Sequence, residues 1–126
     1  MKRLFAFFFI SIFFFSCQKE KQATIVGLWT EISDCIRDNS GALDCSGAPR
    51  FPLILTLSED GKYYAFNDVP AGHGTYHYNY GSKQLTFEDS GGTVSIVTVS
   101  VLNDDYLVTD YSRNGILEYS QKYLRK

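Results

Sequence analysis

The stretch LILTLSEDGKYYAFN, residues 53–67, contains the pattern that decides the fold. Its three leucines alternate with Ile54 and Thr56, so they share one face of a β-strand. Asp60-Gly61 follows, and this dipeptide favours the tight turn of a β-hairpin. Lys62–Asn67 provides the returning strand. The stretch therefore predicts two antiparallel strands joined by a hairpin.

The same alternation recurs along the chain, and helix signals are almost absent after residue 17. Gly81-Ser82, Gly91-Gly92 and Asn114-Gly115 are further turn signals. The eight predicted strands are Ile25–Ser33, Leu53–Leu57, Lys62–Asn67, Thr75–Tyr80, a strand containing Leu85 and Phe87, Thr93–Leu102, Tyr106–Tyr111 and Ile116–Arg125. Val94 and Ile96 are out of phase with the valines that follow them, which predicts a β-bulge near Ile96.

Short sequential strands joined by hairpins predict an antiparallel meander. A meander has two exposed edges unless it closes, and closure into an up-and-down barrel removes both. The predicted fold class is therefore all-β, an antiparallel eight-stranded up-and-down barrel, with an open sandwich as the alternative. Eight strands enclose an interior just wide enough for filling side chains or one small ligand.

The first seventeen residues have the organisation of a secretion signal. Lys2-Arg3 is a positive start, Leu4–Phe15 is an apolar run, and Ser16 is a small residue before Cys17. The run is too short to span a bilayer, which needs about 20 apolar residues. The sequence therefore predicts export, and an ordinary secretory peptide with a chance cysteine is the alternative to a lipid-modified one.

Phe14-Phe15-Ser16-Cys17 resembles the bacterial lipobox. The resemblance implies cleavage after Ser16 and a lipidated Cys17 that carries thioether-linked diacylglycerol and palmitate. Several acyl chains anchor a protein stably to a membrane, whereas one is marginal. The residue after Cys17 is Gln18 rather than aspartate, which resembles the pattern of lipoproteins sorted to the outer membrane. The expected location is therefore the cell envelope of a Gram-negative bacterium, with the protein facing either the periplasm or the surface. The expected domains are 1–16, a cleaved signal peptide; 17–24, a lipid-anchored tether; and 25–126, the barrel.

The charge of the mature chain excludes one class of partner. Cleavage removes Lys2 and Arg3 from the twelve basic residues, leaving ten against fourteen acidic ones and a formal net charge of −4. No basic run is present, so we expect no binding of nucleic acid. Cys35 and Cys45 predict a disulfide, because an isolated cysteine pair in an exported protein is usually oxidised. A metal site is the weaker alternative, since no histidine lies nearby in the sequence.

Gly27-Leu28-Trp29 opens the first predicted strand, and Arg125 lies at the end of the last. In a closed barrel these strands are neighbours, so Arg125 would stack on Trp29, a cation–π contact of about 0.5–2 kcal/mol. A Gly-x-Trp motif, a hairpin meander and a late arginine resemble the lipocalin-like family, particularly the small lipocalin-like domains of bacterial lipoproteins. The resemblance covers about residues 25–126 and implies a barrel floor made by Gly27, Trp29 and Arg125.

The nine tyrosines are the compositional oddity of the chain. They have two interpretations: a ligand-lining surface, or barrel filling with cross-strand pairing outside. The candidate lining residues are Tyr64, Phe66, Tyr76, Tyr78 and Phe87. The candidate filling residues are Leu55, Leu57, Phe66, Leu85, Phe87, Val99 and Tyr119. The segments Cys35–Cys45 and Asp68–Gly72, both expected to be loops, are the candidates for a ligand-facing mouth.

The residues offer little for catalysis or metal binding. His73 and His77 would stand roughly 13 Å apart along a strand, too far for one ion. No Gly-x-Ser-x-Gly elbow is present, and the paired acids lie in or beside predicted turns. We therefore expect no cofactor, no metal and no enzymatic activity. The expected function is a membrane-anchored binding module for a small apolar ligand or an envelope protein; the alternative is an accessory lipoprotein with a filled barrel.

Overall fold

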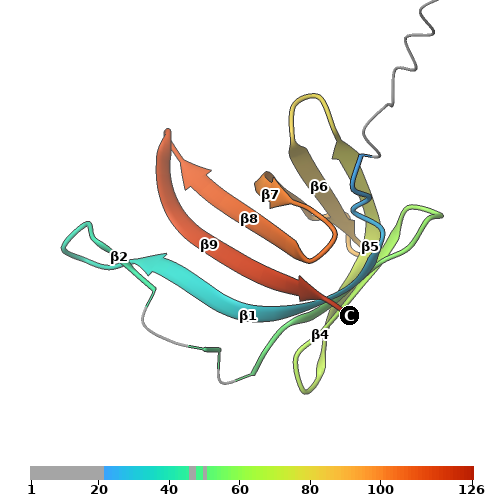
Figure 1. Ribbon diagram of the computed structural model, residues 1–126, viewed down its shortest axis with the longest axis horizontal. Coiled ribbons are helices and arrows are strands. Elements are labelled where there is room, and N and C mark those ends of the chain that lie inside the picture. Colours follow the sequence, from blue (N-terminus) through green and yellow to red (C-terminus); the bar gives the residue numbers. More distant parts are fainter. Residues whose placement is uncertain (1–21, 46–47, 50) are drawn as a thin grey trace, which may run out of the picture.

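The computed structural model describes residues 22–45, 48–49 and 51–126. The predicted signal peptide and Cys17 lie outside them. The described chain is a closed, antiparallel, up-and-down barrel of eight strands, which confirms the expected fold class (Figure 1). The strands are β1 (Gly27–Arg37), β2 (Leu43–Asp44), β3 (Ile54–Leu57), β4 (Lys62–Phe66), β5 (Pro70–Asn79), β6 (Gln84–Asp89), β7 (Val94–Leu102), β8 (Tyr106–Arg113) and β9 (Ile116–Arg125). The ninth of these, β2, pairs only with the end of β1 and lies outside the barrel wall.

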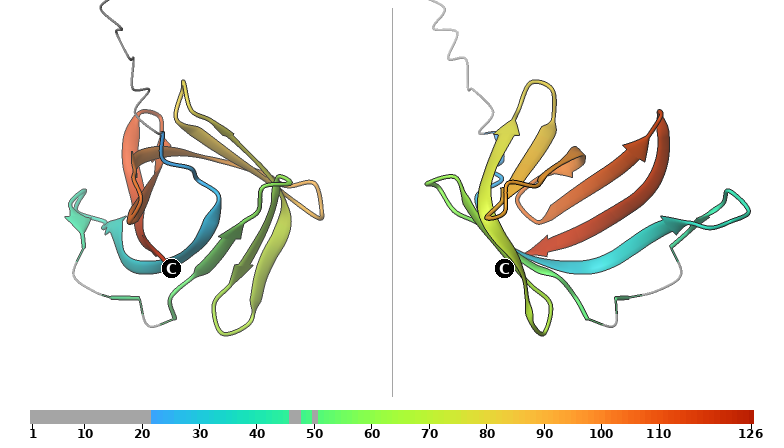
Figure 2. Two further views of the ribbon diagram at one scale, coloured as in Figure 1. Left: turned by 45° about the vertical axis from the view of Figure 1, so that its right-hand side comes forward. Right: turned by 180° about the vertical axis from the view of Figure 1, so that it is seen from behind.

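The barrel closes because β1 has a partner on each side. Gly27–Thr30 pairs with β3, and the segment from Trp29 to Ile36 pairs with β9 (Figure 2). Because the strands run up and down, the turns 58–61, 80–83 and 103–105 lie at the same end as Gly27 and Arg125. We call this the floor end. The opposite end, which carries the β1–β2 turn and the turns 67–69, 90–93 and 114–115, is called the flared end.

Two hairpin turns have the conformation that the sequence predicts. Gly61 has a φ of 79°, and Asn114 and Gly115 have φ values of 51° and 76°. Residues other than glycine, asparagine and aspartate are disfavoured in this left-handed region. The turn residues therefore fix the register of β3 against β4 and of β8 against β9.

Several predicted strand boundaries and the predicted bulge position were wrong. The first strand extends to Arg37, and β5 begins at Pro70 where Asp68–Gly72 was expected to be a loop. A glycine of β5 allows close packing against β6, because a Cβ on Gly74 would lie 2.0 Å from the carbonyl oxygen of Glu88. The bulge of β7 lies between Val99 and Val101 rather than near Ile96.

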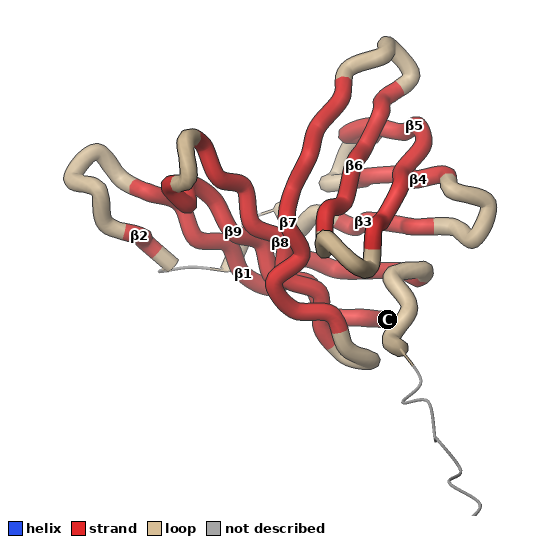
Figure 3. The backbone as a smooth tube through the Cα atoms, turned by 90° about the horizontal axis from the view of Figure 1, so that it is seen from above, coloured by secondary structure: helices blue, strands red, loops and turns tan. Residues whose placement is uncertain are grey.

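The barrel does not stay paired along its whole height. Val94–Thr98 of β7 pairs with β6, whereas Thr98–Leu102 pairs with β8. The β6–β7 and β8–β9 hairpins consequently diverge, and their turns lie far apart in Figure 3. The wall is thus continuous near the floor end and divided toward the flared end. Among the described residues, no helix is long and apolar enough to cross a bilayer.

Candidate functional site

The floor end is closed by one aromatic ring and one guanidinium group. Trp29 is fully buried, and Arg125, its register partner on β9, places its guanidinium carbon 4.1 Å from the centre of the indole ring. This is the geometry of a cation–π contact. The indole nitrogen of Trp29 donates a hydrogen bond to the carbonyl of Ile25 at 2.9 Å, which satisfies its one polar atom.

Arg125 also binds the segment that precedes β1. Its Nη1 and Nη2 donate to the carbonyl oxygens of Val26 and Thr24 at 2.8 and 2.6 Å, and its Nε donates to the carbonyl of Asp104 at 2.8 Å. One side chain therefore joins the entry of the chain, its last strand and the β7–β8 turn. Gly27 makes room for it, because a Cβ at that position would lie 2.6 Å from Nη1.

Above the floor the interior is filled by side chains. Trp29, Leu57, Leu85, Leu107 and Val99 are the largest fully buried residues. Of the predicted filling residues, Leu55, Leu57, Leu85 and Val99 are buried, Phe87 packs against this cluster, and Tyr119 is half-buried higher up on β9. Phe66 does not belong to the cluster, because it alternates with the buried Ala65 and so faces the other way.

The five candidate lining residues form two groups, one that packs against the core and one that faces outward. Tyr76, Tyr78 and Phe87 pack against the core, and Phe87 meets Tyr63 edge-to-face with ring centres 4.9 Å apart. Tyr64 was wrongly placed among the lining residues. It is 45 % exposed and lies with its register partner His73 at an outer-surface depression of about 430 Å³. Phe66 shares the outward phase of Tyr64, so it does not line the interior either.

A layer of polar side chains follows toward the flared end. Glu31 is buried; it accepts hydrogen bonds from the backbone N–H of Leu53 at 3.0 Å and from Nε2 of Gln121 at 3.2 Å. Burial, and then the charges of Glu31 and Asp34, raise the pKa of Tyr119 to about 12. Burial, followed by the charge of Glu31, also raises the pKa of Tyr123.

The tyrosines of the polar layer cannot act as bases at neutral pH. A raised pKa keeps each phenol protonated there, so each hydroxyl is available as a hydrogen-bond donor. Sequence reasoning missed this layer. Glu31 gave a usable signal, because it stands two residues after Trp29 and therefore shares the inward face of the same strand.

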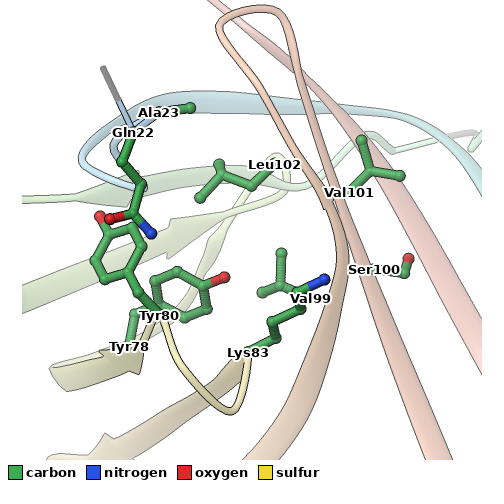
Figure 4. A pocket seen from close by; sticks show the side chains of 9 residues that line it. All are labelled: Gln22, Ala23, Tyr78, Tyr80, Lys83, Val99, Ser100, Val101 and Leu102. Carbon is green, nitrogen blue, oxygen red and sulfur yellow. The ribbon is translucent and has the colours of Figure 1, made fainter. Parts of the chain in front are cut away.

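A first pocket, of about 350 Å³, lies where the segment before β1 passes over β7 and the β5–β6 turn (Figure 4). Tyr78, Val99 and Leu102 supply its apolar wall, and Tyr80 and Lys83 supply polar groups. The remaining lining residues are Gln22, Ala23, Ser100 and Val101. The pocket thus lies beside the filled core rather than inside it.

A second pocket, of about 400 Å³, lies at the flared end between β1, β8 and β9. Ile36, Tyr111 and Tyr119 line it together with charged groups of Arg37, Asp38 and Glu118. Two features hold its β1 side in place. Cys35 and Cys45 form the predicted disulfide, and Nε of Arg37 donates to the carbonyl of Leu117 at 2.6 Å. The segments that hold Cys35–Cys45 and Asp68–Gly72, the predicted mouth, both reach this end of the barrel.

The histidines and acids do not converge. His73 and His77 both lie on the outer face of β5. Within the described part of the chain, no group of three or more histidine, cysteine, aspartate or glutamate side chains is placed to hold a metal ion.

In comparisons with known proteins, neither a family model nor a curated protein matches the chain.

Proposed function

We propose that this chain is a lipid-anchored lipoprotein of the bacterial envelope, whose lipocalin-like barrel is a non-catalytic binding module for a partner protein. The proposal of an anchor rests on the order of residues 1–17, with Cys17 as the lipid-bearing residue and the membrane as the first partner. The proposal of a binding module rests on how the attachment of the incoming chain orients the filled floor end and the exposed flared end of the barrel.

The single observation that carries the module is the attachment of the incoming chain to the floor. Arg125 holds the carbonyls of Thr24 and Val26, so the tether enters at the floor end. Cys17 is five residues before Gln22, and five residues span at most about 18 Å. An anchored barrel would therefore keep its floor end near the bilayer and direct its flared end away from it.

The flared end has the surface that a protein partner needs. Large apolar side chains are exposed there, among them Ile36, Val69, Val94, Ile96 and Ile116. Exposed apolar side chains at one end of a barrel favour a protein-binding role there. The divided wall adds unpaired strand edges to this surface.

A second candidate function, the binding of a small apolar ligand, is favoured by the first pocket. Its volume of about 350 Å³ falls within the range of small-molecule sites, which begins at about 300 Å³. A ligand in this pocket would lie against Tyr78 and Leu102 and under Gln22. It would sit near the membrane end, in contrast to a protein bound at the flared end.

Two measurements test the proposal. Cys17→Ser should abolish incorporation of labelled palmitate and move the protein from the membrane fraction to the soluble envelope fraction; retention of both in the variant would refute the anchor. Native mass spectrometry of the wild-type protein, purified from its own membrane, should show a protein bound at fixed stoichiometry. A co-purifying lipid or small molecule instead would support the second candidate, and neither would favour an accessory role for a filled barrel.

A further inference from the structure

One edge of β7 has unused backbone hydrogen-bonding groups. The N–H of Val99 donates to Lys83, and Thr93 accepts from Asp89, so the odd-numbered residues of β7 bond toward β6. In an antiparallel ladder the alternate residues bond to the other side. Val94 and Ile96 therefore direct their N–H and C=O groups toward β8, yet the first residue of β7 to pair with β8 is Thr98.

The strand that faces this edge is open as well. Tyr111–Arg113 of β8 pairs with β9 but with no residue of β7. The views of Figures 1 and 3 agree that β8 turns with β9 away from the β6–β7 hairpin. The division of the barrel wall is thus bordered on both sides by unpaired backbone.

The side chains at this edge lack the usual protection against strand addition. Natural edge strands carry lysine, proline or inward charges that prevent pairing with another chain. The segment Val94–Val97 reads Val-Ser-Ile-Val and has none of these. Val94 and Ile96 are 55 % and 51 % exposed, so their β-branched side chains offer an apolar stripe beside the open backbone.

The charges around this edge are acidic. Glu88 is the register partner of Val94, Asp89 follows it on β6, and Asp110 is the register partner of Thr98. Arg113 is the basic residue of the facing β8 edge, and its Nε lies 3.8 Å from the carboxylate of Glu118. An added strand would therefore meet net negative potential along its length.

We propose that the β7 edge at Val94–Val97 binds an extended segment of a partner protein as an added β-strand, and that this segment alternates apolar with basic residues. The site rests on the proposed function, because it names where the partner binds and by what chemistry. Backbone hydrogen bonds supply affinity in this mode, and alternate side chains supply specificity. Apolar side chains of the segment would pack beside Val94 and Ile96 on the outer face of the sheet. Its alternate, basic side chains would point to the inner face, where Asp89 lies in the phase of the core residues Leu85 and Phe87.

A second copy of the chain fits this edge less well. An interface of two four-residue edges buries far less than the roughly 1,200 Å² that a stable interface needs. The formal net charge of the mature chain is negative, and like charges oppose the association of two copies.

The test uses the protein purified from whichever cell fraction contains it and a fluorescein-labelled peptide of five Lys-Val repeats. Fluorescence anisotropy should show saturable binding. A peptide of five Glu-Val repeats should not bind. A Lys-Val peptide N-methylated on alternate residues should bind at least about tenfold more weakly, because it loses two or more backbone hydrogen bonds of about 1 kcal/mol each.

Two variants locate the site on β7. Ile96→Lys places a charge at the open edge and should weaken binding by about tenfold or more, since it opposes both the apolar contact and the basic peptide. Val101→Lys is the matched control: Val101 is 41 % exposed on the same strand, where β7 is already paired with Val108 of β8, and this change should alter affinity less than about twofold. The tryptophan fluorescence of both variants should match that of the wild type.

Three results would overturn the proposal: no saturable binding, equal loss in the two lysine variants, or equal affinity of the N-methylated peptide. A concentration-dependent dimer abolished by Ile96→Lys would assign the edge to a second copy instead. None of these results depends on lipidation of Cys17, so loss of the anchor and loss of the edge site are distinguishable outcomes.

Discussion

Replacement of Arg125 by alanine should destabilise the barrel, because this side chain joins three segments at the floor end. The change removes the stacking on Trp29, worth about 0.5–2 kcal/mol. It also removes three charge-assisted hydrogen bonds. The carbonyls of Thr24 and Asp104 are exposed and regain water, so only the part-buried bond to Val26, about 1.5–3 kcal/mol, counts in full. We expect a total loss of about 2–5 kcal/mol.

Urea denaturation monitored by fluorescence measures this loss directly, because Trp29 is the only tryptophan and lies under the guanidinium group. Arg125→Lys should lose about half as much, since an ammonium group keeps the charge but cannot reach three carbonyls at once. Lys126→Ala is the surface control, because the hydrogen bond of Lys126 to Leu28 uses its backbone N–H. If Arg125→Ala and Lys126→Ala have equal free energies of unfolding, the structural role given to Arg125 is wrong.

Three further predictions concern other parts of the barrel. Reduction of the Cys35–Cys45 bond, which closes a loop of ten positions, should lower the free energy of unfolding by about 2–3 kcal/mol, measured by urea titration with and without dithiothreitol; an unchanged midpoint would contradict this. The pKa of Tyr119 is raised from 10.0 to about 12, so its contribution is complete below pH 10 and is lost as the pH rises to about 12. Urea midpoints should fall over that window, and less steeply in Tyr119→Phe; parallel curves would argue against the shift. Gly74→Ala should cost more than about 3 kcal/mol, because its Cβ would lie 2.0 Å from a carbonyl oxygen, whereas Gly72→Ala, whose nearest contact is 3.8 Å, should change stability by less than about 1 kcal/mol; similar thermal midpoints for the two variants would refute this packing.

The strand order and turns could be predicted because they depend on local signals. Alternation in residues 53–57 and the Asp60-Gly61 turn fix one hairpin without reference to the rest of the chain. The start of β5 could not be predicted in this way. Propensity favours a loop at Pro70, Gly72 and Gly74. In the structure these residues belong to β5, and the absence of a side chain at Gly74 allows β6 to approach closely.

The misplaced bulge of β7 has a more informative cause. It was inferred from the assumption that Val94 and Ile96 must face the core, which would need a change of phase before Val97. In the structure these two side chains face outward, and the ladder with β6 runs through them without a shift. When apolar residues lie on an outward face, periodicity alone therefore predicts the wrong register. Similarly, Tyr64 could not be assigned to a face, because Tyr63 beside it is equally suited to the core.

The pairing of β1 with β9 also decides when this protein can fold. The bond between Arg125 and the carbonyl of Val26 joins residues 99 positions apart, and the barrel is closed only through contacts of this kind. A chain is synthesised from its N-terminus, so Trp29 emerges 96 residues (125 − 29) before its stacking partner Arg125. Until β9 has emerged, β1 lacks the neighbour that closes the barrel, and closure through such non-local contacts is slow. A chain that lacked Arg125 would keep its β1–β9 pairing without the side chain that seals it at the floor end.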